Sequence, residues 1–164
     1  MTMPDSLQSR LLCDVTIELR PGAPVVLGQS PWSTRRVSDI VGGRFDGPRL
    51  SGRVCASGAD WSQRGSGASG EVMTLLDVRS LWETDDGAAL YVTYGGRFVL
   101  PADVLAEIAD PARVDAVSPQ RYYFRTNPLF ETASERYAWL NATVTIGVGK
   151  RTATGVTYRI FEVL

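Results

Sequence analysis

Hydrophobic and polar residues alternate along much of this chain with a period of two, which is typical of β-strands. In residues 13–20, CDVTIELR, one face carries Val15, Ile17 and Leu19, and the other carries charged and hydroxyl side chains. Further strands are expected over the ranges 50–56, 72–83, 88–94, 141–149 and 155–164. The pattern therefore predicts a mainly β protein.

Turn residues separate these strands at short intervals. Asp86-Gly87 is the expected chemistry of a tight hairpin turn after 72–83, and KRTAT (150–154) predicts a hairpin at the C-terminus. One helix is expected over 101–110, and a second short turn over 132–139. Short strands joined by glycine-rich turns favour an antiparallel barrel or sandwich with one or two short helices.

The totals fit one domain that carries little net charge. The chain has 164 residues, 44% of them hydrophobic, and a formal net charge of −1. We predict a flexible segment over 1–10 and a single domain over 11–164. The charge gives no reason to expect a nucleic-acid or membrane partner. The first residues lack the apolar core of a signal peptide, so we expect a cytoplasmic protein with Cys13 and Cys55 reduced.

The residues that are missing narrow the chemistry further. The sequence has no histidine, which excludes histidine triads and histidine-ligated metal sites, and its one lysine, Lys150, lies in a turn-like segment. Acid–base chemistry would fall to Asp, Glu, Tyr or Cys, with Arg as a fixed cation. We expect no cofactor and no metal.

A glycine pattern at Gly65, Gly67 and Gly70 matches the dinucleotide-binding fingerprint in its spacing. That fingerprint requires a helix after the glycines, because the helix N-terminus holds the pyrophosphate. The residues that follow, EVMTLLDVRSLW, alternate like a strand. The pattern therefore predicts a hairpin loop and no nucleotide site.

Three groups of residues are candidates for chemistry. Asp77 and Arg79 share one face of strand 72–83, either as a dipole in a barrel lumen or as a structural ion pair or solvated face. In Asp60-Trp61, the indole could desolvate the acid and raise its pKa, or the pair could form a turn that caps the core. The third group, residues 122–141, is rich in aromatic side chains, which describe either a pocket wall or a core edge.

Several blocks of this sequence resemble, in order, the family called domain of unknown function 3237. The blocks are GGRFDGPRLSGRV (42–54), SGADW (57–61), LLDVRSLWETDDGAALYV (75–92), YYFRTNPLFET (122–132), YAWLN (137–141) and FEV (161–163). The resemblance covers about residues 11–164. It implies an antiparallel β-barrel similar in outline to calycin or allene-oxide-cyclase-like barrels, with no known obligatory cofactor.

The family's recurrent polar positions fall here on Asp60, Trp61, Asp77, Arg79, Tyr123, Arg125, Glu131, Tyr137, Trp139 and Asn141. Two positions depart from the family pattern. Ser57 replaces a usual glycine, and Ser80 replaces a usual tyrosine, which leaves open any role that depends on that tyrosine.

Our first hypothesis is a cofactor-free lyase, isomerase or cyclase for a small hydrophobic carbonyl compound, possibly in secondary metabolism. Asp60 would be the general acid–base, Arg79 positioned by Asp77 would bind a carboxylate or oxyanion, and Tyr94 or Tyr123 would donate to that oxygen. The expected substrate-binding residues are Trp61, Arg125, Phe130, Glu131, Tyr137, Trp139 and Asn141.

Two alternatives stay open. The first is a barrel that binds a small molecule without chemistry, in which the pKa of Asp60 would be ordinary. The second is a homo-oligomer in which Val15, Ile17 and Leu19, or Val78 and Trp82, lie between subunits.

Overall fold

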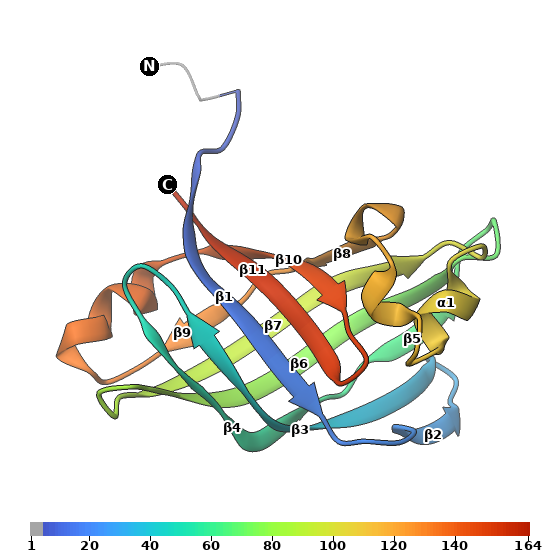
Figure 1. Ribbon diagram of the computed structural model, residues 1–164, viewed down its shortest axis with the longest axis horizontal. Coiled ribbons are helices and arrows are strands. Elements are labelled where there is room, and N and C mark those ends of the chain that lie inside the picture. The colour runs from blue at the N-terminus through green and yellow to red at the C-terminus, as the bar shows by residue number, and fades with distance from the viewer. Residues whose placement is uncertain (1–4) are drawn as a thin grey trace.

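The strands close into an antiparallel barrel in the computed structural model, which describes residues 5–164 (Figure 1). In order around the ring, the wall consists of β1 (Ser9–Leu19), β3 (Thr34–Asp46), β4 (Ser51–Asp60), β6 (Val72–Thr84), β7 (Ala89–Leu100), β8 (Tyr123–Thr126), β10 (Thr145–Arg151) and β11 (Gly155–Val163). β11 then pairs with β1 and closes the ring. The predicted fold class, an antiparallel β-barrel, is confirmed, and the ring has eight strands.

Shorter elements extend the wall and cover its two ends. β2 (Val25–Gln29) pairs with β3, β5 (Gln63–Ser66) bridges β3 and β6, and β9 (Leu129–Glu131) pairs with β7. Helix α1 (Leu105–Ala109) lies at one end of the barrel with two 3₁₀ turns, η1 (Val114–Ala116) and η2 (Pro119–Arg121). A third 3₁₀ segment, η3 (Glu135–Ala142), lies at the opposite end (Figure 1).

Most predicted elements are present, but the helix expected over 101–110 covers only Leu105–Ala109, and the strand expected over 141–149 begins at Thr145, after η3. β6 and β7 form a hairpin whose turn contains Gly87 at φ +87°, a left-handed conformation that favours glycine. The C-terminal hairpin of β10 and β11 is also present. The glycine pattern at 65–70 lies in the hairpin between β5 and β6, as expected for a loop. Residues 9 and 10, predicted to be flexible, belong to β1, and residues 1–4 lie outside the described part.

One face of each wall strand fills the barrel. Leu76, Val78 and Trp82 on β6 point inward together with Val15 and Ile17 on β1, and all five are buried. The expectation that Val15, Ile17, Val78 and Trp82 lie between subunits is therefore wrong, because these side chains are buried inside the barrel. The oligomeric state itself stays a prediction.

The end of the barrel next to η3 is solidly packed with aromatic rings. Trp82 stacks on Phe45 with ring centroids 4.9 Å apart and meets the edge of Phe130 at 5.7 Å. All three side chains are buried. The largest part of the lumen that stays open to a ligand lies at the other end, beside α1.

Across residues 5–164, none of the helices has the length and apolar character that crossing a bilayer requires.

Candidate active site

A cavity of about 490 Å³ occupies the end of the barrel lumen beside helix α1. Its volume lies within the range of about 300–1,000 Å³ that is common for small-molecule sites. Much of the wall is apolar, with contributions from Ile17, Leu76, Val78, Phe98, Leu105, Ile108, Phe124 and Val156. This part of the wall would contact the apolar body of a ligand.

Asp60 is placed in this cavity by the register of the wall strands. It is the last residue of β4 and lies opposite Val78 of β6, which in turn lies opposite Tyr94 of β7. Because facing residues of neighbouring strands share one side of the sheet, all three side chains point into the lumen. The backbone N–H of Asp77 donates to Oδ1 of Asp60 at 3.2 Å, and Ser62 adds a side-chain hydrogen bond.

The environment of Asp60 makes it suited to proton transfer near neutrality. Burial raises the pKa of its carboxyl to about 6, although the hydrogen bonds from Asp77 and Ser62 act in the opposite direction. The charge of Asp77 also raises this pKa, and the charge of Arg36 lowers it. A carboxyl group with this pKa is able both to accept and to return a proton at physiological pH.

Two tyrosines lie beside the acid. Tyr94 and Tyr158 are buried, their ring centroids are 5.6 Å apart, and their hydroxyl groups share a hydrogen bond. Burial raises the pKa of both phenols, so both stay protonated and available as hydrogen-bond donors. When Tyr158 donates to Tyr94, the Tyr94 hydroxyl keeps its own proton for a ligand oxygen.

The polar lining also contains three arginines without an ion-pair partner in the described part of the chain, and the sequence analysis missed all of them. Arg36 of β3, Arg64 of β5 and Arg151 of β10 line the same cavity as Asp60. Burial, and then the charge of Arg36, lower the pKa of both Arg64 and Arg151, as expected for cations gathered together. The guanidinium of Arg151 also donates to the backbone carbonyl of Gly155.

The predicted lumen position of Asp77 and Arg79 is wrong. Both side chains are about half exposed on the outer wall of β6, where Nη1 of Arg79 lies 3.0 Å from Oδ1 of Asp77. Trp61 lies on the same outer side, with the Arg79 guanidinium 5.8 Å from its ring centroid. The uncharged face of β6 points into the lumen, because burial of the ion pair would remove the hydration of both charged groups.

Three more predicted residues also lie outside the cavity. Tyr123 is 52% exposed on the outer wall, where the Arg125 guanidinium lies 5.1 Å from its ring centroid. Glu131 is exposed on β9. Tyr123 is therefore not the donor beside Asp60, and Tyr94 occupies that place.

The remaining predicted residues hold the closed end of the barrel together. Phe130 belongs to the aromatic plug, and the buried Tyr137 donates to Oδ1 of Asp86 at 3.0 Å. The amide of Asn141 makes two hydrogen bonds of 2.9 Å with the backbone of Thr132. Trp139 packs under the guanidinium of Arg49, 3.8 Å from its ring centroid. These four side chains pack and hydrogen-bond within the protein, as the alternative interpretation of segment 122–141, a core edge, expects.

Of the residues predicted as site residues, Asp60 and Tyr94 line the cavity. Their catalytic role stays a prediction. A signal for the missed residues was present in the alternation of the strands. Tyr158 shares its inward face with Val156 and Ile160, and Arg36 lies two residues before Ser38 and four before the buried Ile40.

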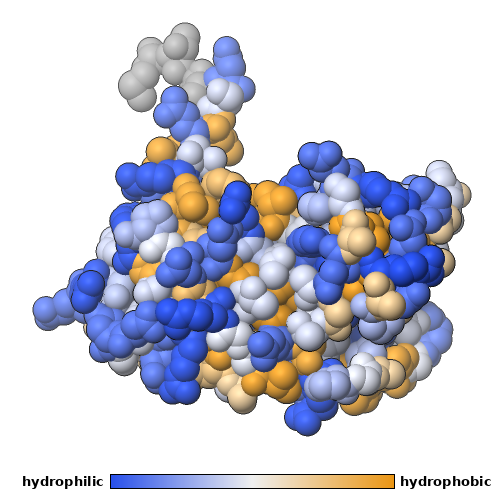
Figure 2. Space-filling model, in the orientation of Figure 1, coloured by the Kyte–Doolittle hydropathy of each residue, from blue (hydrophilic) through white to orange (hydrophobic). Residues whose placement is uncertain are grey.

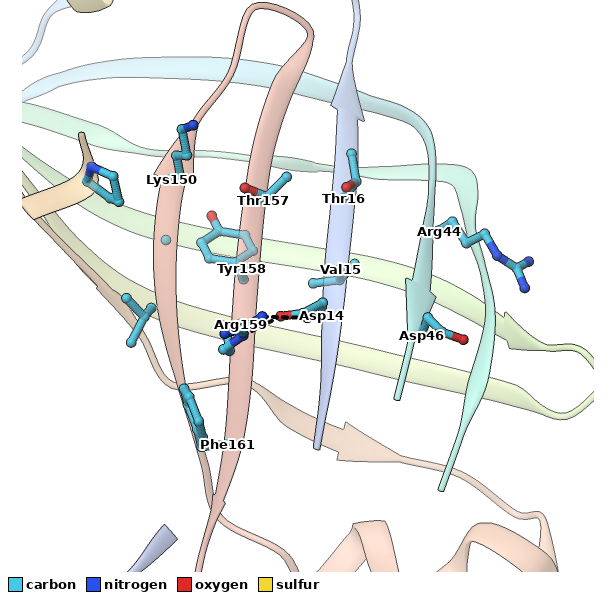
Figure 3. Close-up of a pocket in the computed structure, with 13 residues that line it drawn as sticks. Asp14, Val15, Thr16, Arg44, Asp46, Lys150, Thr157, Tyr158, Arg159 and Phe161 are labelled. Carbon is cyan, nitrogen blue, oxygen red and sulfur yellow. Dashed lines mark hydrogen bonds and ion pairs between the residues drawn. The ribbon is translucent and has the colours of Figure 1, made fainter. Parts of the chain in front are cut away.

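A second hollow lies on the outer wall, over β1, β10 and β11 (Figure 3). Its volume is about 670 Å³, and Arg159 there donates to both carboxylate oxygens of Asp14, at 2.8 and 3.0 Å. Figure 2 shows hydrophilic side chains and apolar patches side by side on this face. Because Asp14 and Arg159 are exposed and already paired, the lumen cavity is the stronger candidate for chemistry.

Comparison with known proteins identifies the family. The model of the "Protein of unknown function (DUF3237)" family matches residues 9–163. The chain belongs to this family. Within it, a UPF0311 protein of Rhodopseudomonas palustris (strain TIE-1) is 34% identical over 149 residues, which cover 91% of this chain and 93% of the relative. The resemblance found in the sequence is thus confirmed.

Solved structures place DUF3237 chains in the same fold. A β-barrel-like protein from Acinetobacter baumannii superposes with a TM-score of 0.80 at 33% identity, over the full length of both chains. An enzyme from Penicillium herquei superposes with a TM-score of 0.67 at 22% identity, over 100% of this chain and 99% of its own. At that identity the likeness shows the fold alone.

Proposed function

We propose that this protein is a cofactor-independent enzyme that moves a proton on a small hydrophobic carbonyl compound, as a lyase, isomerase or cyclase. The observation that carries the proposal is a carboxyl group, Asp60, that faces a largely apolar cavity next to a pair of buried tyrosines. A structural neighbour from Penicillium herquei is an enzyme, so the barrel is compatible with catalysis.

The proposed first step is removal of a proton from the carbon next to the substrate carbonyl. The carboxylate of Asp60 accepts this proton, and the electron pair of the broken C–H bond moves to the carbonyl oxygen as an enolate. The Tyr94 hydroxyl donates a hydrogen bond to that oxygen, which favours the charge that develops there. In an isomerisation, Asp60 returns the proton to another carbon of the enolate system. In an elimination, the bond to a leaving group on the next carbon breaks and the leaving group takes the proton. In a ring closure, the enolate carbon bonds to a second carbonyl carbon of the substrate, and the oxygen of that carbonyl takes the proton.

The apolar side chains of the cavity support such a step because they reduce the contact of the reacting atoms with water. An enolate formed among Leu76, Phe98 and Phe124 has little contact with bulk water, so a single hydrogen-bond donor has a large effect on its energy. Burial raises the pKa of Asp60, which brings it closer to the pKa of the substrate C–H group that Asp60 must deprotonate.

The first proton step is measurable before the natural substrate is known. We expect the protein to catalyse deuterium exchange at the α-carbon of some members of a panel of aromatic and alicyclic ketones in D₂O, followed by ¹H NMR. Asp60→Asn should slow this exchange by about 10²–10⁴-fold, which is the usual contribution of a general base.

Asp14→Asn is the matched control, since it changes the same functional group on the outer wall, where the Asp14 side chain is about half exposed and lies outside the lumen cavity. Its exchange rate should stay within twofold of the unmodified protein. Equal rates for Asp60→Asn and the unmodified protein would refute the assignment of Asp60. Tight binding of the ketones without any exchange would support the alternative, a barrel that only binds its ligand.

A further inference from the structure

The charges that line the lumen cavity do not balance. Four arginines and two aspartates contribute to its lining: Arg20, Arg36, Arg64, Arg151, Asp39 and Asp60. Nε of Arg20 lies 2.9 Å from Oδ2 of Asp39, so these two charges compensate each other at the rim. Arg36, Arg64 and Arg151 are then left in the lining with the one carboxyl group of Asp60, and the exposed residue Arg64 also borders a neighbouring surface hollow.

None of these three guanidinium groups forms an ion pair within residues 5–164. The ion pairs there involve other arginines, and the side chain of Arg151 is bound to an uncharged carbonyl, that of Gly155. Asp60 itself is held by the Asp77 backbone N–H and by Ser62. Its single charge would in any case leave an excess of two positive charges.

The barrel fold gathers these cations from distant parts of the chain. Arg36 and Arg64 lie on the paired strands β3 and β5, where the Arg36 N–H donates to the Ser62 carbonyl at 2.8 Å. Arg151 reaches the cavity from β10. Like charges in a partly dry cavity repel one another, and an anion between them would relieve that repulsion.

The rest of the cavity accepts an apolar body. Phe98 stacks on Phe124 with ring centroids 4.3 Å apart, and Leu105 and Ile108 of α1 lie over the same space. Guanidinium groups bind carboxylates through paired, charge-assisted hydrogen bonds. Guanidinium groups also bind phosphates, but the proposed function requires a carbonyl compound in this cavity, which favours a carboxylate as the anion.

We propose that Arg36, Arg64 and Arg151 bind the carboxylate of an aromatic or alicyclic acid, so that the substrate class is an apolar oxo acid. Its reacting carbonyl would then lie near Asp60 and Tyr94. The choice of substrate class rests on the proposed function, whereas the anion site itself is testable by binding alone.

The test uses a matched pair of probes, 2-naphthoate and the uncharged 2-naphthamide, measured by isothermal titration calorimetry at pH 7.5 and low salt. We expect 2-naphthoate to bind at least tenfold more tightly than 2-naphthamide. Arg36→Gln, Arg64→Gln and Arg151→Gln should each weaken 2-naphthoate binding by about tenfold or more and change 2-naphthamide binding by less than twofold.

Arg79→Gln is the control, because it removes an arginine from the outer wall, and its affinity for 2-naphthoate should not change. Thermal unfolding of every variant separates loss of binding from loss of fold, and Arg36→Lys, which keeps the charge, should restore part of the affinity. Equal binding of the two probes, or 2-naphthoate binding that all three cavity variants leave unchanged, would overturn the inference. Tighter binding of 2-naphthyl phosphate than of 2-naphthoate would overturn the carboxylate assignment.

The proposed enzyme activity and the proposed anion site can be refuted independently of each other. Asp60→Asn should abolish deuterium exchange while 2-naphthoate binding is kept or becomes tighter, because the variant removes a negative charge from the cavity. Asp60-dependent exchange, together with 2-naphthoate binding that none of the three arginine variants weakens, would overturn the anion site alone. Arginine-dependent binding without Asp60-dependent exchange would overturn the enzyme alone.

Discussion

The two sides of the β4–β6 wall place similar groups in opposite environments. On the inner side, Asp60 lies in a largely apolar cavity with tyrosines and unpaired arginines. On the outer side, Asp77 and Arg79 form an ion pair that is about half exposed. The backbone N–H of Asp77 donates a hydrogen bond to the side chain of Asp60 and so connects the two aspartates. The comparison shows that exposure, more than residue type, decides which acid is suited to chemistry.

The largest expected difference between the two sides is in packing. Trp82 is 1% exposed inside the barrel, whereas its neighbour Leu81 is 40% exposed outside. Trp82→Ala should lower the free energy of unfolding by about 3–5 kcal/mol, because it leaves a void against Phe45 and Phe130.

Leu81→Ala should cost less than about 1 kcal/mol, as is usual for surface positions. Urea unfolding of both variants measures the two losses. Similar losses for the two variants would show that the side of β6 assigned to the core is wrong.

A second difference is expected in the pH dependence of stability. The pKa of Asp60 is about 6 in the fold and near 3.8 in the unfolded chain, so the folded state holds the proton more tightly. Stability should therefore fall as the pH rises from about 4 to 6 and stay level above about 7, by at most about 3 kcal/mol.

Asp60→Asn removes this titration, so the variant should gain stability relative to the unmodified protein between pH 4 and pH 8. Chemical unfolding of both proteins across this range is the measurement. A stability difference that does not change with pH would mean that Asp60 titrates alike in the folded and unfolded states.

The smallest effect is expected for the outer ion pair. Arg79→Ala should change the free energy of unfolding by less than about 1 kcal/mol, because half-exposed ion pairs are well solvated and screened by salt. The same measurement at low and at 1 M salt tests this explanation. A loss of several kcal/mol would indicate that Arg79 has a structural role that its ion pair does not explain.

The barrel could be predicted from the sequence because strands and hairpin turns are encoded by residues that are close together in the chain. Strict alternation in 13–20 and 72–83, together with a turn at Asp86-Gly87, defines strands and hairpins without reference to the rest of the chain. The inward face of 72–83 was harder to predict. Leu75 and Leu81 make the outer face partly apolar as well, and only the closed barrel shows which face is dry.

The candidate site was predictable only in part. Asp60 was found through its neighbour Trp61, although the indole lies on the outer side and the dryness around the acid has another source. Arg36, Arg64 and Arg151 are far apart along the chain, and each alone looks like an ordinary surface arginine. Strand pairing around the ring brings them together, and no local pattern encodes that.

The most direct test of the account is an NMR titration of the Asp60 carboxyl carbon, assigned by its loss in Asp60→Asn. We predict a pKa of about 6, since burial in the cavity disfavours the charged form. A pKa near 3.9, the ordinary value for an aspartate, would contradict the claim that this barrel keeps an acid out of water for proton transfer.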